Sequence, residues 1–264
     1  MKKIIITFCL AMLLVPTASY GWSKFGHQIV VAVAQRHLTK KAQANIEKIM
    51  PYDMKVDAGW MDRHRKDSLI KHTNYWHCYD ADANCKYDPN KSIRRGDAMR
   101  GVLLADYNLS NLDAMSDSLK LLSLRMIIHF AGDFHCPVHV RYNDIKMRGD
   151  WYMGEKKWGN FHHVYDGMPS KLFKGKSPDE VAEYLDSKVK KDQIKKWQSG
   201  TFVDWFDAAS KGNRSIYEIN PPCTEKGRHQ LNPKTVELSR ANIEEQLTAA
   251  GYQLALLLNK YFDK

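Results

Sequence analysis

Histidine and aspartate residues recur in this chain at spacings that would bring them together on helices. In the segment HFAGDFHCPVH, His129 and Asp133 lie four residues apart inside an apolar run, so a helix would place both on one face. His139 follows just beyond Pro137, whereas His135 points off that face and is interpreted as structural or exposed. Buried imidazoles and carboxylates must be hydrogen-bonded, ion-paired or metal-bound, because an isolated buried charge is costly. A hydrogen-bonded His–Asp pair in the core explains this segment as well as a metal site does.

Three further segments carry residues of the same kinds. NFHHVYD places His162 and Asp166 four residues apart, and the adjacent His163 lies three from Asp166, so spacing alone leaves both histidines open as candidates. GWMDRHR offers Asp62, and YWHCYD offers His77. Each signal is weak by itself, because a histidine four residues from an aspartate occurs by chance in many helical proteins.

The N-terminal segment predicts proteolytic processing. Two lysines precede an apolar run over residues 4–15, and Ser19 and Gly21 are small residues at −3 and −1 of a cut after Gly21. This pattern is typical of a secretory signal peptide over residues 1–21, and the run is too short for a permanent membrane anchor. We therefore expect export to the periplasm or the medium.

Cleavage after Gly21 would make Trp22 the first residue of the mature chain. Its α-amino group and its own carbonyl oxygen could then chelate a metal ion, and His27 follows five residues later. The alternative is that Trp22 is simply a core aromatic residue near a processed end.

Together these segments supply nine candidate metal ligands. They are Trp22, His27, Asp62, His77, His129, Asp133, His139, His162 and Asp166. Imidazole nitrogen and carboxylate oxygen without thiolate suit catalytic zinc, whose open positions hold water or substrate. Nine groups are too many for one zinc ion, but they would furnish three ions if one carboxylate bridges two of them.

The elements that must position these ligands are predicted to be helices joined by polar loops. Thr39 is an N-cap for a stretch that stops at a proline, and the apolar spacing over residues 119–134 predicts a longer helix. Ser177 begins a capping box, and Thr201 begins another helix. A last long helix is expected near the C-terminus, where apolar residues between Leu247 and Tyr261 share one face.

The fold class predicted from this pattern is all-α, with a single domain over residues 22–264. Residues 143–158, rich in Gly, Trp and Tyr, are expected to form a small hairpin or a long loop. Removing the two leader lysines lowers the formal net charge from +10 to +8. A basic exported protein favours anionic partners such as nucleic acid, phosphorylated substrates or a lipid surface, although the charge could serve solubility alone.

Four cysteines remain after the leader is removed: Cys78, Cys85, Cys136 and Cys223. An even number in an exported chain favours disulfides, and four cysteines allow three pairings. Cys78 with Cys85, leaving Cys136 with Cys223, is the preferred pairing. Their spacing fits none of the paired-cysteine zinc patterns.

The order and spacing of the motifs resemble the trinuclear-zinc, single-strand-specific nucleases of the S1/P1 family. The match runs through WSKFGH, WMDRHR, YWHCYD, HFAGDFHCPVH and NFHHVYD to the terminal AGYQLALLLN, and so covers essentially the whole mature chain. The resemblance implies a compact helical bundle of the phospholipase C/nuclease type with long loops, which binds three Zn²⁺ ions.

The resemblance also implies which of the nine ligands would bind each of the three zinc ions. The first ion would take Trp22 and His27, the second Asp62, His77 and His129, and the third His139, His162 and Asp166. Asp133 would bridge the first two ions. In the family motif the last histidine follows Asn and a hydrophobic residue, which selects His162 over His163.

Catalytic and substrate-binding roles follow from the same resemblance. Asp62 and Asp133 would hold the ions that activate a hydroxide, and Arg65 would face the scissile phosphate. Asp80 matches an acid that reads the edge of a bound base. Fungal members stack a base on an aromatic residue where this chain has Cys78, so stacking is expected from Tyr79 instead.

A second departure is Arg148-Gly149-Asp150 in place of a Gly-Gly-Asn stretch, which puts an acid where it could repel a phosphate. The implied function is a monomeric endonuclease that cleaves single-stranded DNA and RNA to 5′-phosphorylated products, acts on nucleotides through a 3′-nucleotidase activity and has no stable membrane association. The alternatives are a zinc-dependent phospholipase C, whose third site usually has glutamate where Asp166 stands, and a metal-binding or nucleic-acid-binding module without catalysis.

Overall fold

Helices form most of the structure, a computed structural model that describes residues 21–91, 94–145, 149–153, 155–220, 228–231 and 233–264. The helices are α1 (Lys24–Arg36), α2 (Lys40–Ile49), α3 (Trp60–Arg63), α4 (Ala98–Ser110), α5 (Asp117–Asp133), α6 (Phe161–Asp166), α7 (Met168–Leu172), α8 (Pro178–Asp186), α9 (Lys191–Trp197), α10 (Phe202–Glu218) and α11 (Pro233–Phe262). Two short 3₁₀ helices also bear on the site, η2 (Lys71–Tyr75) and η5 (Pro137–His139). The predicted all-α class is confirmed.

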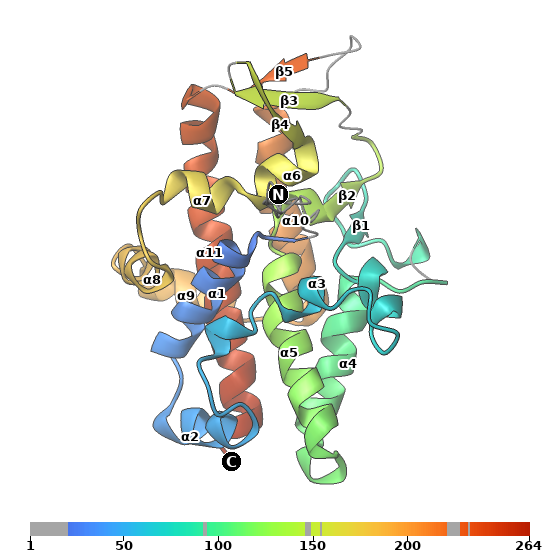
Figure 1. The fold of residues 1–264 in the computed structure, drawn as a ribbon, viewed down its shortest axis with the longest axis vertical. Coiled ribbons are helices and arrows are strands. Elements are labelled where there is room, and N and C mark those ends of the chain that lie inside the picture. Colours follow the sequence, from blue (N-terminus) through green and yellow to red (C-terminus); the bar gives the residue numbers. More distant parts are fainter. Residues whose placement is uncertain (1–20, 92–93, 146–148, 154, 221–227, 232) are drawn as a thin grey trace, which may run out of the picture.

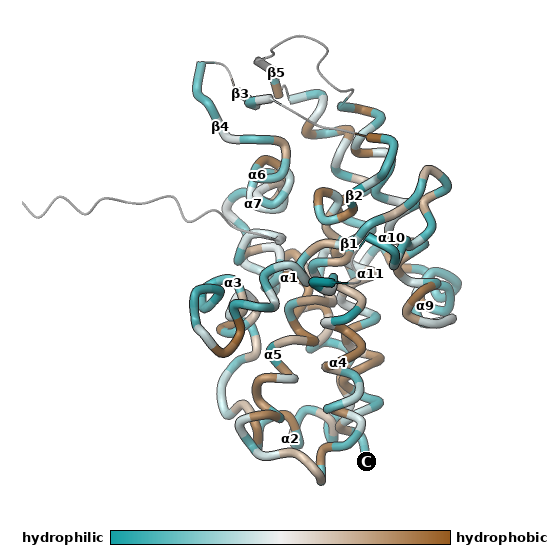
Figure 2. Tube along the Cα trace, turned by 90° about the vertical axis from the view of Figure 1, so that its right-hand side faces the viewer, coloured by the Kyte–Doolittle hydropathy of each residue, from teal (hydrophilic) through white to brown (hydrophobic). Residues whose placement is uncertain are grey.

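The core forms where long amphipathic helices pack along one another. α4 and α5 lie side by side, and α1 packs against α8 and α11 (Figure 1). Hydrophobic residues, coloured brown in Figure 2, recur along α4 and α5. Ile127 and Ile128 of α5 and Leu254 and Leu258 of α11 are fully or almost fully buried, as the apolar spacing predicts.

Side-chain caps fix where several helices begin. The Thr39 side chain accepts a hydrogen bond from the backbone N–H of Ala42, and α2 starts at the next residue after Thr39. Ser177 and Glu180 form the predicted capping box of α8. Thr201 opens α10 with Asp204 as its partner. These predicted helix starts are confirmed.

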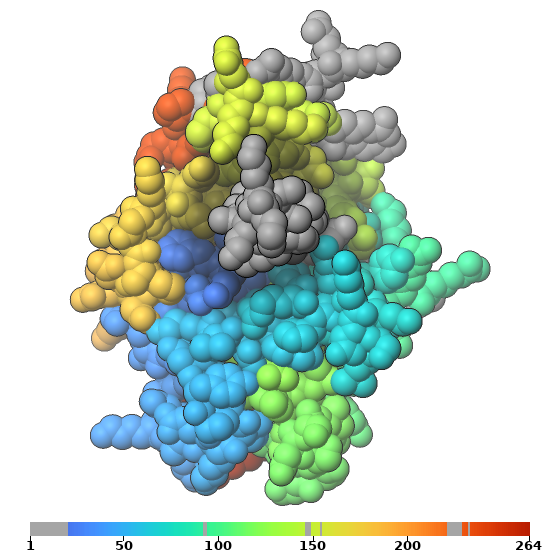
Figure 3. Space-filling view, in the orientation of Figure 1, coloured from blue at the N-terminus to red at the C-terminus, as the bar shows by residue number. Residues whose placement is uncertain are grey.

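Small strands lie at the ends of the helices. β1 (Tyr79–Ala81) pairs in parallel with β2 (Val140–Tyr142). β3 (Asp150–Met153) and β4 (Lys156–Asn160) form the hairpin expected between residues 143 and 158, and β5 (Arg228–Gln230) adds to β3. In the space-filling view this hairpin stands at one end of the molecule and α2 near the other (Figure 3). Within the described residues no helix is both long and apolar enough to cross a membrane.

The expected bridge between Cys78 and Cys85 is wrong, because both cysteines are free. The extended strand β1 begins directly after Cys78 and carries the chain roughly 10 Å away, at about 3.3 Å per residue. Cys85 lies beyond it, in a turn closed by its N–H on the carbonyl of Asp82 at 3.0 Å. A disulfide needs Cα atoms within about 7 Å. Cys136 is free as well, and Cys223 lies outside the described residues.

Candidate metal centre

The predicted ligands converge at the C-terminal end of α5. α5 contributes His129 and Asp133, and α1 contributes His27. Trp22 precedes α1, and the remaining ligands come from α3, from the turn before β1, from η5 and from α6. The backbone N–H of Ser23 donates to the carbonyl of Asp166 at 2.8 Å, which brings the start of α1 against α6. Figure 1 shows α6 and the start of the described chain close together above the end of α5.

Asp133 lies at the centre of the cluster and is fully buried. Its Oδ1 is 3.4 Å from Nε2 of His27 and 3.5 Å from Nδ1 of His139, and its Oδ2 is 3.2 Å from Nε2 of His129. The two carboxylate oxygens therefore face different histidines. That is the arrangement a bridging carboxylate requires.

A second group forms around Asp62, whose Oδ1 is 3.5 Å from Nε2 of His77 and 3.8 Å from Nε2 of His129. Nδ1 of His129 lies 3.0 Å from the carbonyl of Ala58, which fixes Nδ1 as the protonated nitrogen and leaves the lone pair of Nε2 directed at the cluster.

Arg125 of α5 holds α3 in place. Its guanidinium lies 4.3 Å above the ring of Trp60 and is 2.7 Å from the carboxylate of Asp57. The helix that carries Asp62 is thereby fastened to the helix that carries His129 and Asp133.

A third group forms between η5 and α6. Nε2 of His162 is 3.2 Å from Nε2 of His139 and 3.4 Å from Oδ2 of Asp166. His163 is exposed, so the structure brings His162 and not His163 to the cluster. Cys136 adds a thiol 3.6 Å from Oδ1 of Asp166, a contact that the cysteine spacing did not indicate.

One glycine allows the two imidazoles of α1 and α5 to meet. A Cβ at Gly132 would lie 2.8 Å from Nδ1 of His27, closer than the ring can tolerate. The absence of a side chain lets the rings of His27 and His129 stack at 4.2 Å with 19° between their planes. The glycine beside Asp133 is therefore part of how the cluster is built.

The chemistry of the buried atoms fits a metal cluster. The ligand atoms that are buried without a hydrogen bond in the described part of the chain are Nδ1 and Nε2 of His27 and His77, Nε2 of His129, Nδ1 of His139, both oxygens of Asp133 and Oδ2 of Asp166. Buried polar atoms normally have partners, so this concentration requires an explanation. Two ligand atoms at tetrahedral positions on one zinc ion are about 3.3 Å apart, close to most separations found here.

Burial sets the protonation of the same groups. Desolvation lowers the pKa of His77 to about 3 and that of His162 to about 4. The same cause lowers the pKa of His27, His129 and His139. The imidazoles are consequently neutral at neutral pH, the form that binds metal ions. Desolvation also raises the pKa of Asp133 and Asp166, so their anionic forms need a nearby cation.

Trp22 is fully buried beside this cluster. The residue before it, Gly21, has a φ of +131°, and a Cβ there would lie 2.2 Å from Oδ1 of Asp133 and 3.1 Å from Nε2 of His27. The backbone at the predicted cleavage point therefore lies directly against two of the predicted ligands.

The predicted substrate-binding residues have mixed outcomes. Tyr79 is 0% exposed, and its hydroxyl donates to the carbonyl of Phe206 at 3.2 Å. Tyr79 therefore belongs to the core, and the expectation that it stacks a base is wrong. All three residues of β1 are buried, so the position after Cys78 faces the protein interior. Arg65 lies just after α3, partly exposed, with its carbonyl held by Asn74 at 3.1 Å.

Two acids have basic partners that the sequence reading missed. Asp80 is paired with Arg141, whose Nη2 lies 2.8 Å from Oδ2 of Asp80. Asp150 forms an ion pair with Lys157 across the β3–β4 hairpin, which offsets the repulsion of phosphate expected from an acid there. Only the register of the strands could have revealed these pairs.

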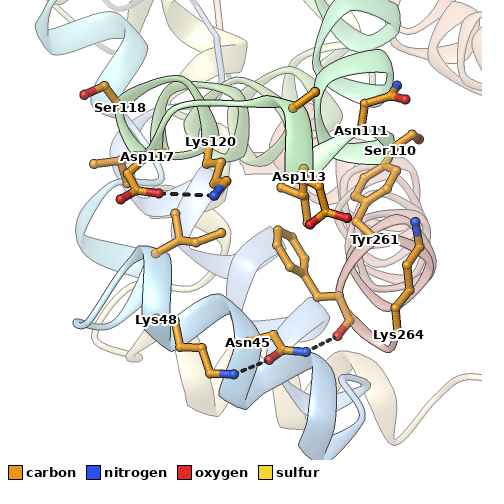
Figure 4. Close-up of a pocket in the computed structure, with 15 residues that line it drawn as sticks. Asn45, Lys48, Ser110, Asn111, Asp113, Asp117, Ser118, Lys120, Tyr261 and Lys264 are labelled. Carbon is orange, nitrogen blue, oxygen red and sulfur yellow. Dashed lines mark hydrogen bonds and ion pairs between the residues drawn. The ribbon is translucent and has the colours of Figure 1, made fainter.

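Pockets are present both beside the cluster and far from it. One of about 560 Å³ includes His162 in its wall. A larger one, about 810 Å³, lies at the other end of the molecule between α2, the α4–α5 connection and the C-terminus (Figure 4). Its polar side chains already bond to one another, as Lys120 does with Asp117 at 3.2 Å, and no histidine lines it. The chemistry therefore belongs to the pocket beside the cluster.

Comparison with known proteins identifies sequences that are similar to this chain. A family model described as S1/P1 Nuclease matches residues 22–263. The chain is 26% identical to Endonuclease 2 of Arabidopsis thaliana over 69% of this chain and 70% of that protein. It is 25% identical to Endonuclease 4 of the same plant over 91% and 89%, and 22% identical to Nuclease S1 of Aspergillus oryzae over 94% of each chain. Because the family model covers nearly the whole chain, this protein belongs to the S1/P1 nuclease family, whose members are zinc-dependent hydrolases of phosphodiester bonds.

Proposed function

We propose that this protein is an endonuclease that hydrolyses single-stranded DNA and RNA to 5′-phosphorylated products, with 3′-nucleotidase activity, at a cluster of three zinc ions. The observation that carries the proposal is the convergence of buried imidazoles and carboxylates around Asp133, many of whose ligand atoms have no hydrogen bond. The relatives found are nucleases, which does not favour the phospholipase C alternative.

The ligands divide into three sets under this proposal. Trp22 and His27 would hold the first ion, Asp62, His77 and His129 the second, and His139, His162 and Asp166 the third. Asp133 would be shared by the first two. When bound, zinc lowers the pKa of a coordinated water toward 7 and neutralises charge on phosphate oxygens.

Other residues of the protein hold the ligands in position, supply positive charge to the phosphate and bind a base. Ala58 holds the ring of His129, and Arg125 anchors α3, so the carboxylates and imidazoles are preorganised before substrate binds. Arg65, three residues after Asp62, contributes a fixed positive charge to the crowded phosphate of the transition state. The pocket beside His162 receives a base that has left its stack, which favours single strands.

We also propose that the chain is exported as a monomer and cut after Gly21. The position of Gly21 supports this, because its Cα lies where any side chain would strike Asp133. Removing residue 21 would clear that space and leave the amine of Trp22 beside the cluster. Mass spectrometry of active protein should find Trp22 as the first residue. Active protein that retains residues ahead of Trp22 would contradict this part of the proposal.

The decisive experiment compares substrates on one preparation. Protein beginning at Trp22 is incubated with single-stranded DNA, RNA and phosphatidylcholine vesicles, and its zinc content is measured on the same sample. We expect cleavage of both nucleic acids, with new 5′-phosphates, and three zinc ions per chain. Hydrolysis of the lipid alone would overturn the proposal.

A further inference from the structure

Next to the metal centre is a pocket whose walls suit a flat, uncharged ring. It measures about 560 Å³, and the apolar part of its lining includes Val138, Val140, Ile145, Phe161 and Tyr217. His162 of the third ligand group also forms part of its wall. Apolar walls favour a nucleobase over a phosphate, because an anion would lose its hydration there without compensation. A base in this pocket would lie beside the reacting phosphate.

The charged group that this pocket presents is the guanidinium of Arg141, and Asn160 adds a polar side chain to the same lining. Arg141 lines the pocket, and the parallel register of β1 and β2 sets it opposite Asp80. In the resulting ion pair the Arg141 side chain is 47% exposed, whereas that of Asp80 is 11% exposed. The carboxylate is therefore the anchor, and the N–H donors of the guanidinium face the substrate.

The orientation of the Asp80–Arg141 ion pair determines which base edge Arg141 can recognise. Nη2 of Arg141 bonds to Asp80, and the other guanidinium nitrogens have no protein partner in the described residues. A guanidinium is a rigid planar fork that matches two neighbouring acceptors. On its Hoogsteen edge guanine offers such a pair in O6 and N7, whereas the same edge of adenine has an amino group beside N7 and the corresponding edge of cytosine has an amino group.

We propose that Arg141 is a specificity-determining residue, which Asp80 holds so that its guanidinium reads the acceptor edge of guanine in the pocket beside His162. This inference rests on the proposed nuclease function. It also changes the role of Asp80, which anchors the reading residue instead of reading the base itself.

The test measures kcat/KM on the complete set of DNA dinucleotides, which are too short to form secondary structure. We expect the unmodified protein to favour guanine at one of the two positions. Arg141→Ala should lower kcat/KM for those substrates by roughly 10- to 100-fold, the discrimination expected of one bidentate arginine, and leave the adenine counterparts unchanged. Arg141→Lys keeps the charge but not the fork, and it should lose the preference too.

Arg36→Ala is the matched control. Arg36 forms an ion pair with Asp186 of closely similar exposure, 44% and 12%, on the α1–α8 side of the molecule. This variant should keep both the rate and the preference. Every variant should retain the zinc content of the unmodified protein and remain fully folded at the assay temperature, which excludes misfolding as the cause.

Three outcomes would overturn the inference. The first is an unmodified protein without preference for guanine. The second is an Arg141→Ala protein that keeps the preference. The third is an equal loss on all dinucleotides together with a salt dependence of binding to longer strands reduced by about one unit, which would make Arg141 a phosphate contact. In each case cleavage of the dinucleotides by the unmodified protein would still support the proposed function, so the two failures are distinguishable.

Discussion

The substitution Asp133→Asn tests the metal centre most directly. Asparagine has nearly the shape of aspartate but no negative charge, and an amide nitrogen replaces one carboxylate oxygen. Both oxygens of Asp133 lie within 3.2–3.5 Å of histidine nitrogens, so one amide N–H must face a group that is itself needed as a ligand. The substitution thus removes a shared anionic ligand from two proposed ions at once.

The size of the effect follows from that sharing. Loss of even an outer-shell partner of a metal ligand costs roughly 10- to 100-fold in affinity. A bridging carboxylate contacts two ions directly, so a loss of about 100-fold at each ion would lower their joint occupancy by about 10⁴-fold. We expect zinc content to fall from three ions toward one and hydrolysis of single-stranded DNA to become undetectable.

Thermal melting with and without chelator separates this effect from misfolding. Burial raises the pKa of Asp133 above the value of an unfolded aspartate, about 3.9. At pH 7 the buried carboxyl of Asp133 therefore destabilises the metal-free fold, and asparagine removes this destabilisation. With zinc the variant should melt below the unmodified protein, and with chelator it should melt at the same temperature or higher. A variant that binds three zinc ions and cleaves DNA at the normal rate would refute the bridging role.

Four other substitutions probe three separate parts of the molecule. Arg65→Ala should lower kcat by roughly 100-fold or more with zinc content unchanged, as for other preorganised charges, and an unchanged rate would remove Arg65 from the mechanism. His162→Ala should lose zinc and activity while His163→Ala, at an exposed position, keeps both; the reverse result would reassign the ligand. Burial raises the pKa of Asp186, but hydrogen bonds from His37 and Arg36 lower it by more. The pKa of Asp186 is therefore below its usual value. A lowered pKa stabilises the fold above the unfolded value of about 3.9, and this contribution is lost as acid titrates the pair. Urea unfolding should therefore find Asp186→Asn less stable than the unmodified protein at pH 7, with a difference that shrinks as the pH falls below about 3.9, whereas a constant difference would disprove the linkage.

Local sequence patterns predicted the helices and the ligand pairs because both depend on spacing along one element. Ser177 begins its helix through atoms within three residues, and His129 meets Asp133 through the helical repeat. Such features do not require knowledge of the rest of the chain. The choice of His162 over His163 came instead from the family motif, since both spacings are compatible with one helix.

Contacts between distant segments were not predictable in the same way. Asp80 and Arg141 lie 61 residues apart and meet only because two three-residue strands pair in parallel. Strands this short carry too little alternation to be recognised in the sequence. The burial of Tyr79 and the separation of Cys78 from Cys85 depend on the same strand β1. Both errors concern residues whose surroundings are set by tertiary pairing.

The packing of α1 on α11 has a consequence for the order in which the molecule is completed. Every proposed zinc ligand lies between residues 22 and 166, yet the helix that carries His27 packs along the helix formed by residues 233–262. The ribosome therefore synthesises all the ligand residues well before it synthesises α11, the helix against which α1 packs. Zinc that binds a nascent chain meets an incomplete set of neighbours, and the mature coordination waits for the final helix to dock. Substitutions that destabilise α11, which contributes no ligand, would therefore lower the amount of bound zinc.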